Sequence, residues 1–157
     1  SKVMENVQLS KNFSLSELCK SSTATRLNID NTPQDNEIVD NLKCVATNIL
    51  QPIRDKFGVP FTPNSGYRSP TLNEAIKGSS KSQHCAGEAV DVEVPTIDNL
   101  VLAHWIAINL NFDQLILEYY VKGEPKSGWV HVSCLNEGNR KEVLTYDGKM
   151  YQKGFPN

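Results

Sequence analysis

Two of the three histidines in this chain have neighbours and spacing that could hold a metal ion. His84 is followed seven positions later by Asp91, with Gly87 between them. Imidazole and carboxylate both bind zinc, and bonds near 2.0 Å bring two ligand atoms on one tetrahedral ion to about 3.3 Å from each other. A straight helix would separate residues seven apart by about 10 Å along its axis, so it is excluded. A loop that folds back into a strand fits, and Gly87 supplies the backbone freedom.

We predict that His131 is the third ligand that such a site needs. Residues alternate between the two faces of a strand, so His131 shares a face with Trp129 and Ser133 in the segment 129–133. If that strand pairs with the segment 89–94, His131 and Asp91 face each other across the sheet. Asp91 then interrupts a valine-rich strand because its face is the functional one. The spacing of His84 and Asp91 is not specific alone, since most single histidines or aspartates in strands are structural or exposed.

The helices that must position these residues are predicted from caps and periodicity. Ser14 and Glu17 match a capping box, which starts a short helix. Thr32-Pro33 is predicted to start a longer helix that ends at Gly58 and is kinked or divided by Pro52 near Gln51. Ser69-Pro70 is predicted to cap a short helix that runs through Ile76.

The second half of the chain is predicted to hold most of the strands. Residues 78–87 form a polar loop, and residues 89–94 alternate as a strand. Residues 96–110 are apolar on nearly all sides, which predicts a buried helix with His104 as a core residue. Two paired strands, 112–120 and 129–134, flank the loop 121–128, and residues 143–151 form a hairpin that turns at Asp147-Gly148. Helices first and strands later indicate one α+β domain over residues 1–157, with a central antiparallel sheet and helices on one face.

Composition excludes several classes of partner. The formal net charge of -2 gives no reason to expect a nucleic acid or an anionic membrane as partner. No apolar run approaches the roughly 20 residues of a membrane span, so no membrane insertion is expected. The first residues, SKVMENVQLS, do not resemble a signal peptide. We expect a monomer.

The four cysteines form no C-x-x-C pair. A disulfide between Cys19 and Cys44 is possible, but free buried thiols are the preferred interpretation. Cys85 could bind metal if His84 turned away, although we interpret it as a small buried side chain.

A series of motifs in fixed order makes the assignment more specific. Together they resemble the zinc D-alanyl-D-alanine carboxypeptidases and the related L-alanyl-D-glutamate endopeptidases of phage endolysins, whose fold also occurs in the hedgehog signalling domain. The resemblance extends from residue 13 to about residue 133. The motifs are Ser65-Gly66-Tyr67-Arg68-Ser69-Pro70, Leu72-Asn73, Ser82-Gln83-His84-x-x-Gly87-x-Ala89-x-Asp91 and Trp129-Val130-His131-Val132-Ser133.

The resemblance implies roles for individual residues. It implies one Zn²⁺ ion held by His84, Asp91 and His131. Arg68 matches the arginine that binds carbonyl or carboxylate oxygens of the substrate, for which a guanidinium fork is suited. Ser82 is expected to contact substrate or to orient its loop, although a plain loop serine is an equal alternative. Tyr67 and Trp129 are expected to form walls of the cleft, although aromatic residues more often simply pack.

The general base is where the sequence departs from the family pattern. Many relatives carry Glu or Asp three residues before the last histidine, and that position is Gly128 here. Glu118, after the apolar run 115–117, and Glu124, in the loop 121–128, are the two replacements. Similar phage-type members carry an acid at the position of Glu118, so we favour Glu118. A carboxylate in that setting is expected to have a raised pKa, which suits proton transfer.

The function implied is a zinc metallopeptidase that hydrolyses peptide stems of bacterial peptidoglycan, at either the D-Ala–D-Ala or the L-Ala–D-Glu bond. It would be made in the host cytoplasm and act at the cell wall or periplasm, or be part of a virion. The alternative is a non-enzymatic, zinc-binding module of a phage particle, which the missing acid at Gly128 would support. A zinc hydrolase for another substrate, such as a free dipeptide, is a third possibility.

Overall fold

The computed structural model describes residues 5–157, and in this range five strands form one sheet that packs with helices. The helical segments are α1 (Leu15–Cys19), α2 (Ser22–Arg26), α3 (Asn36–Val45), η1 (Ala46–Leu50), α4 (Gln51–Phe57), α5 (Pro70–Ala75) and α6 (Asn99–Asn109). The strands, in the spatial order β1-β3-β2-β4-β5, are β1 (Ala89–Val92), β2 (Gln114–Glu118), β3 (Trp129–Ser133), β4 (Glu142–Tyr146) and β5 (Tyr151–Lys153). The predicted α+β class is confirmed.

The sheet is antiparallel except at one pair. β3 pairs antiparallel with both β1 and β2, as predicted, and β5 pairs antiparallel with β4. β4 instead runs parallel to β2. The reason is the order of the strands: β1 and β2 already occupy both edges of β3, so β4 must take the free edge of β2. The chain returns along β3 before it reaches that edge, and β4 therefore runs in the same direction as β2.

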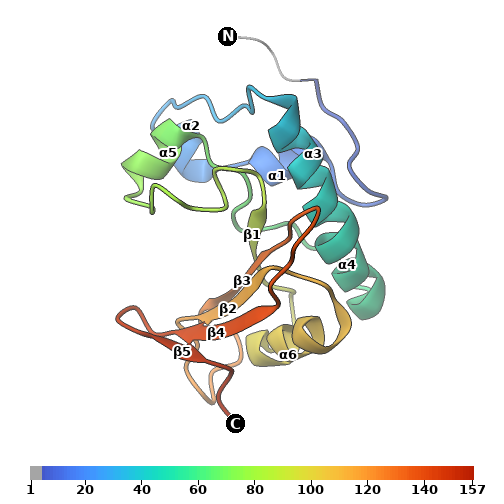
Figure 1. Ribbon diagram of the computed structural model, residues 1–157, viewed down its shortest axis with the longest axis vertical. Helices are drawn as coiled ribbons and strands as arrows, with labels where there is room; N and C mark the ends of the chain where they lie inside the picture. The colour runs from blue at the N-terminus through green and yellow to red at the C-terminus, as the bar shows by residue number, and fades with distance from the viewer. Residues whose placement is uncertain (1–4) are drawn as a thin grey trace.

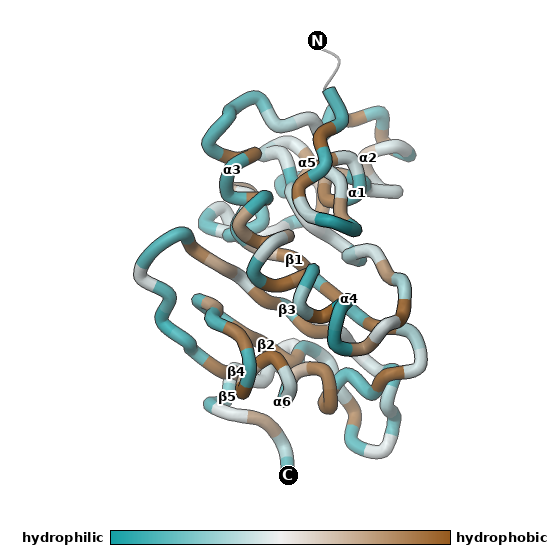
Figure 2. Tube along the Cα trace, turned by 90° about the vertical axis from the view of Figure 1, so that its right-hand side faces the viewer, coloured by the Kyte–Doolittle hydropathy of each residue, from teal (hydrophilic) through white to brown (hydrophobic). Residues whose placement is uncertain are grey.

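One face of the sheet forms the core and the other faces solvent. Alternate residues of β1, β2 and β3 point to the helices and are fully buried, and each large apolar side chain of this kind stabilises the fold by about 1.5–3 kcal/mol. The residues on this face are Val90, Val92, Leu115, Leu117, Val130 and Val132. Hydrophobic residues concentrate in these strands, while the surrounding loops are largely hydrophilic (Figure 2).

The helices divide between two ends of the molecule (Figure 1). α1, α2 and α5 lie together at one end, and α6 lies beside the sheet at the other. The continuous α3–η1–α4 segment runs along one side and connects the two ends. No helix within residues 5–157 is long and apolar enough to span a membrane.

The predicted helix caps are mostly confirmed, but α3 begins later than expected. Ser14 and Glu17 form both hydrogen bonds of the capping box, and the Ser69 hydroxyl accepts from the backbone N–H of Leu72. The cap of α3 is Asp35, not Thr32. The Asn31 side chain donates to Cys19 O and Tyr67 O and accepts from Ser69 N–H. These bonds hold the segment before α3 against other parts of the chain, so the helix begins only after it.

The long helix is divided near Gln51, next to Pro52, as predicted. Residues 46–50 form a π-helical turn, and α4 starts at Gln51 with Pro52 in its first turn. Proline has no N–H to donate, so the backbone ahead of it must rearrange its hydrogen bonds. The helix then ends at Gly58, which has φ 66°, as predicted.

The prediction that α6 is buried on all sides is wrong. Val101 and Ile108 are 53% and 77% exposed on its outer surface. His104 is also exposed and packs edge-on against Phe155, so it is not a core histidine. α6 packs against β2 and β3 with one face only. The sequence could not reveal this, because the outer face of the helix is also apolar.

The four cysteines are free in the described structure. Cys19, Cys44 and Cys134 are buried, which agrees with the preferred interpretation. The Sγ atom nearest to Cys44 belongs to Cys134, at 3.5 Å, so the alternative pairing with Cys19 is not the one that the fold brings together.

Candidate metal centre and cleft

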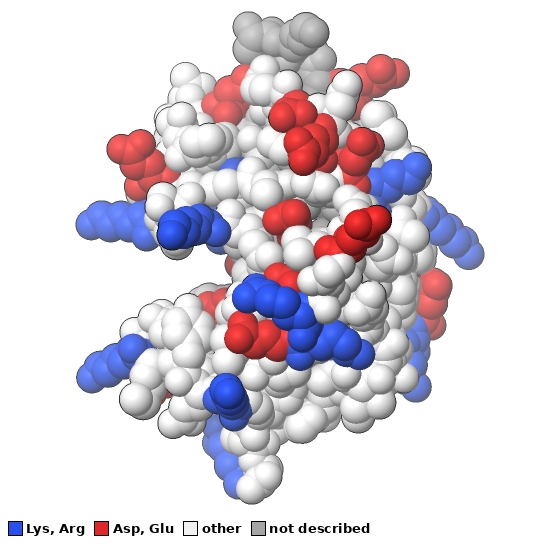
Figure 3. Space-filling model, viewed as in Figure 1, with Lys and Arg blue, Asp and Glu red and all other residues white. Residues whose placement is uncertain are grey.

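The solvent-facing side of the sheet forms the floor of a cleft of about 920 Å³. Its opposite wall is the segment that follows α5, residues 76–84. In the space-filling view the cleft is a deep notch between the two ends of the molecule (Figure 3). His84, Asp91, His131, Glu118, Arg68, Ser82 and Trp129 all line it. It therefore collects every residue predicted for the site except Tyr67.

His84 is held in a fixed orientation by the loop before β1. It is 1% exposed, and its Nδ1 lies 2.7 Å from the carbonyl oxygen of Gly66. This contact fixes the proton on Nδ1 and leaves Nε2 free to bind a metal. Nε2 is buried and has no hydrogen-bond partner within residues 5–157. A buried nitrogen without a partner is costly, which indicates that a ligand normally satisfies it.

Gly87 contributes more than the flexibility predicted for it. It has φ 74°, and a Cβ atom there would lie 2.8 Å from the carbonyl oxygen of Ile38. Glycine at this position lets the loop pass close to the first turn of α3 and return to β1. The Ser82 hydroxyl accepts from the backbone N–H of His84, at 3.2 Å, so Ser82 orients the loop while it also lines the cleft.

Asp91 and His131 are direct register partners across β1 and β3, as alternation predicted. Asp91 Oδ1 lies 3.2 Å from His131 Nδ1 and 3.4 Å from His84 Nε2. Burial alone would raise the pKa of Asp91, but contacts with the two imidazoles outweigh it and hold the pKa below its usual range. Asp91 is therefore a carboxylate at neutral pH, which is the form that binds metal.

The three side chains fit a zinc ion. Their ligand atoms all lie within 4.8 Å of one another, and no other histidine, cysteine or acidic residue belongs to this group in the described residues. Two imidazoles and one carboxylate are a common donor set for catalytic zinc, which keeps its fourth position open. The unpartnered Nε2 of His84 is the observation in this structure that supports the fit.

The motif at residues 65–68 holds the site together through its backbone. Ser65 O accepts from Asp91 N–H at 2.8 Å, and Gly66 O contacts His84 Nδ1. Arg68 N–H donates to His84 O at 3.1 Å. Gly66 has no room for a side chain, since a Cβ would lie 2.2 Å from Leu18 O. This short segment therefore positions two of the three predicted ligands.

Arg68 lines the cleft, and a hydrogen bond to Asn73 holds its guanidinium in place. Its Nη1 donates to Asn73 Oδ1 at 3.1 Å, and Asn73 Nδ2 donates to Ser79 O at 2.8 Å. Gly78 makes this possible, because a Cβ there would lie 2.1 Å from Asn73 Oδ1. Nε of Arg68 is buried and has no partner among residues 5–157. Asn73 belongs to the Leu72-Asn73 motif, but the sequence alone does not indicate this role.

Glu118 is the predicted acid that lies beside the three ligands. Its Oε1 is 3.8 Å from His131 Nδ1. Burial raises the pKa of its carboxyl, and Asp91 adds to this effect, while His131 and Arg68 act in the opposite direction. Glu124 is exposed in the loop 121–128 and does not line the cleft.

Gly128 explains why the acid is not at the usual family position. It has φ 62°, and a Cβ there would lie 2.0 Å from Glu118 O and 2.7 Å from the carbonyl carbon of Tyr119. The start of β3 thus passes so close to the end of β2 that no side chain fits at 128. An acid that serves this cleft must come from another element, and Glu118 on β2 is in place.

Tyr67 and Trp129 were both predicted to form walls of the cleft. The prediction for Tyr67 is wrong, whereas the position of Trp129 agrees with it. Tyr67 is 4% exposed, belongs to the hydrophobic core and does not line the cleft. Its backbone N–H donates to Leu18 O, which fixes the chain next to Arg68. Trp129 lines the cleft and packs against Tyr119, with ring centroids 5.1 Å apart. Cys85 lies outside the group of potential metal ligands, as expected, but it is half-buried and not the buried side chain that was predicted.

The sequence motifs did not indicate two further features of the cleft. The first is a pair of lining residues, Arg140 and Gln83, which both donate to Asp113. Asp113 is 1% exposed and does not itself line the cleft. The second feature is a group of tyrosines, Tyr119, Tyr146 and Tyr151. Strand alternation in 142–153 could have indicated only Tyr146 and Tyr151, and it does not show which face is the cleft.

Comparison with known families agrees with this geometry. The family model described as Peptidase M15 matches residues 11–133, which is most of the chain. The chain belongs to the peptidase M15 family. The predicted family is thereby confirmed, and members are zinc-dependent peptidases. No curated protein sequence matches the chain significantly. The matched range includes His84, Asp91, His131, Arg68 and Glu118, and it ends at the last residue of β3.

Proposed function

We propose that this M15 peptidase hydrolyses peptide bonds in the stem peptides of bacterial peptidoglycan. The observation that carries the proposal is the convergence of His84, Asp91 and His131 with Glu118 and Arg68 in one open cleft. A binding module needs neither a carboxylate of raised pKa nor a fixed guanidinium beside its metal ligands. Glycine at position 128 favours a non-enzymatic module, but the presence of Glu118 in the cleft supports an enzyme.

Zinc bound by His84, Asp91 and His131 would polarise the scissile carbonyl and lower the pKa of a water molecule, which is the chemistry that the site requires. Gly66 O and the Ser82 hydroxyl keep His84 in the orientation that binding needs. Asp91 supplies a negative charge, and the β1–β3 register keeps it opposite His131.

Glu118 is proposed as the general base and acid. Its Oε1 would accept a proton from the attacking water and return it to the leaving amine. Its raised pKa brings the carboxyl closer to the working pH, so both steps become easier. Glu124 is not suited to this role, because its side chain lies outside the cleft.

Arg68 is proposed to bind a carbonyl or carboxylate oxygen of the substrate. Its Nη1 already donates to Asn73, so the free edge of the guanidinium, with its unpartnered Nε, is the part available for substrate. The short distance from Arg68 N to His84 O keeps this group in register with the metal ligands. On this proposal the protein acts as a monomer at the cell wall or periplasm, or from within a virion, with peptidoglycan as its partner.

Digestion of purified peptidoglycan tests the proposal. Zinc-loaded protein is expected to release products with a new carboxyl terminus, identified by mass spectrometry, and a chelator should stop the release. Cleavage after L-Ala or release of free D-Ala identifies the bond. A zinc-loaded protein that cuts no stem peptide would refute the proposal and favour a binding module.

Paired variants test the base. Glu118→Gln is expected to lower kcat by about 10²–10⁴-fold, the usual contribution of general acid–base catalysis. Glu124→Gln is the matched control and should retain full activity. Retention of full activity by Glu118→Gln would show that the assignment of the base is wrong.

A further inference from the structure

Four aromatic side chains line one wall of the cleft in an unbroken series of ring contacts. Trp129 packs against Tyr119 with ring centroids 5.1 Å apart, and Tyr119 meets Tyr146 edge-on at 5.6 Å. Tyr146 stacks on Tyr151, its register partner across β4 and β5, at 4.3 Å. We call these four residues the aromatic wall. All four line the same cleft as the predicted metal ligands.

The aromatic wall begins beside Glu118. Tyr119 follows Glu118 directly, and Tyr146 is the register partner of Glu118 on β4. Tyr119 and Tyr151 remain 45% and 58% exposed, so the rings do not simply bury one another. The turn of the β4–β5 hairpin rests on Tyr119, since a Cβ at Gly148 would lie 2.8 Å from its Cε1 atom.

Half of the aromatic wall lies outside the part of the chain that matches the family. The match ends at residue 133, whereas Tyr146 and Tyr151 belong to the β4–β5 hairpin at 142–153. The hairpin is attached to the family core through the parallel pairing of β4 with β2. The hairpin therefore extends the cleft with residues that lie beyond the matched range.

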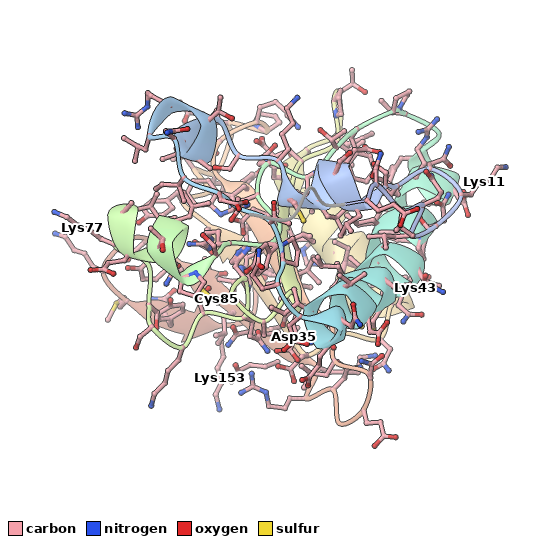
Figure 4. All side chains as sticks on the ribbon, turned by 90° about the horizontal axis from the view of Figure 1, so that it is seen from above. Lys11, Asp35, Lys43, Lys77, Cys85 and Lys153 are labelled. Carbon is pink, nitrogen blue, oxygen red and sulfur yellow. The ribbon has the colours of Figure 1, made fainter. Side chains whose placement is uncertain are left out.

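The wall opposite the tyrosines is polar apart from Ile76. It consists of the segment after α5 and includes Lys77, Ser79 and Lys81. Lys77 extends outward from this segment (Figure 4). A ligand between the two walls must present an apolar surface on one side and hydrogen-bonding groups on the other. A pyranose ring has this character, because its C–H face packs on aromatic rings and its hydroxyl and acetamido groups lie at its rim.

We propose that the aromatic wall binds a sugar ring of the glycan strand to which the stem peptide is attached. This inference rests on the proposed function and specifies its substrate as a peptide that still carries its sugar. Tyrosine suits the task, since it combines an apolar face with a hydroxyl at one end.

The position of the wall also favours one of the two bonds. The stem peptide is attached to muramic acid through L-Ala, so the L-Ala–D-Glu bond lies one residue from the sugar. The terminal D-Ala–D-Ala bond lies three residues farther, or about 10 Å in an extended chain. A sugar bound next to Glu118 therefore places the L-Ala–D-Glu bond at the metal ligands.

Two substrates test the inference: a disaccharide-bearing stem peptide and the same peptide without sugar. Wild-type protein is expected to cut the first with a higher kcat/KM, mainly through a lower KM. Tyr151→Ala should reduce this preference by about 3- to 10-fold, the amount expected for loss of one aromatic contact, and leave cleavage of the sugar-free peptide unchanged. Tyr151→Trp should retain the preference. Met150→Ala is the matched control, because Met150 is 57% exposed in the same hairpin but does not line the cleft.

Three outcomes would overturn the inference. Equal kcat/KM for the two substrates would show that the sugar is not bound. An equal loss on both substrates in Tyr151→Ala would show that the aromatic wall contacts the peptide or only supports the fold. Release of free D-Ala from the disaccharide-bearing peptide would show that the sugar does not lie beside Glu118.

A binding measurement separates this inference from the proposed function. Trp105 packs against Phe57 and does not line the cleft, so a Trp105→Phe variant leaves Trp129 as the only tryptophan. Oligomers of N-acetylglucosamine should change its fluorescence, and Tyr151→Ala should weaken their binding by a similar 3- to 10-fold. Binding without any peptide cleavage would refute the proposed function and support the sugar site. No fluorescence change and no sugar preference would refute the sugar site alone.

Discussion

Replacement of Gly128 by alanine is expected to destabilise the protein by about 2–5 kcal/mol. Gly128 has φ 62°, a left-handed conformation that costs a residue with a side chain about 1–2 kcal/mol. The new Cβ would also lie 2.0 Å from Glu118 O, which is backbone and cannot rotate away. Relief requires the end of β2 and the start of β3 to separate, and overpacking of this kind costs about 1–3 kcal/mol more.

Gly123 provides a matched control in the same loop. It has φ 88°, but a Cβ there would meet nothing within 4 Å. Gly123→Ala therefore carries only the conformational cost, about 1–2 kcal/mol. The free energy of unfolding of each variant is measured by urea denaturation under identical metal-free conditions. Losses that agree within about 0.5 kcal/mol would refute the argument that β2 closes position 128.

A Gly128→Glu variant extends the test to catalysis. It places an acid where many relatives have one, but the backbone leaves no space for the side chain. We expect activity and stability both below wild type, even with Glu118 present. Higher activity than wild type would show that the position can accept an acid, and that the account of the departure from the family pattern is wrong.

Three further predictions concern the groups around the cleft. Asn73→Ala removes the acceptor for Arg68 Nη1. The value of kcat/KM for a stem peptide should therefore fall by about 10- to 100-fold, chiefly because KM rises. An unchanged KM would contradict the role of Asn73 in positioning Arg68. Asp113→Asn should lower the free energy of unfolding at pH 6 by about 1–3 kcal/mol, because hydrogen bonds from Arg140, outweighing burial, lower the pKa of Asp113 to about 2. A carboxyl whose pKa is lowered in the folded state stabilises the fold at pH values above its ordinary pKa near 4, and this contribution is lost as the pH falls toward 2. The difference in urea midpoint between wild type and Asp113→Asn should therefore shrink between pH 4 and pH 2. A difference that stays constant over this range would contradict the assignment. Zinc at 100 times its Kd should raise the free energy of unfolding by about 2.7 kcal/mol, which corresponds to roughly 5–10 °C in Tm by calorimetry. A chelator should reverse this rise, and His84→Ala should abolish it. A rise that persists in His84→Ala would place the ion elsewhere.

Much of the metal centre could be predicted because it depends on local patterns. Alternation in 89–94 and 129–133 assigns Asp91 and His131 to one face of a sheet, and their pairing in register follows once the two strands are neighbours. The loop with Gly87 brings His84 back to β1, as the spacing required. Strand period and glycine placement are properties of short segments, so they can be read without the fold.

Other predictions failed where burial depends on distant segments. Tyr67 and His104 were assigned from their immediate neighbours. In the fold, the backbone N–H of Tyr67 donates to Leu18 O of α1 and its side chain joins the hydrophobic core, while His104 lies on the exposed side of α6. The start of α3 was misplaced because Asn31 is tied to residues 19, 67 and 69, which are near only in space.

The sequence by itself determined the family, the α+β class and the residues able to hold a metal, since the motifs and periodicities that indicate them are local. Only the tertiary structure decided which acid lies in the cleft. The sequence favoured Glu118 but left Glu124 as an alternative, and in the fold only Glu118 lines the cleft beside His131. The close approach of β3 to β2 leaves no room for a side chain at Gly128. The tertiary structure also decided that the β4–β5 hairpin lies against β2 and adds tyrosines to the cleft. Both features depend on which strands pair with the two edges of β2. These neighbours come from distant parts of the sequence, so the pairing is known only from the folded chain.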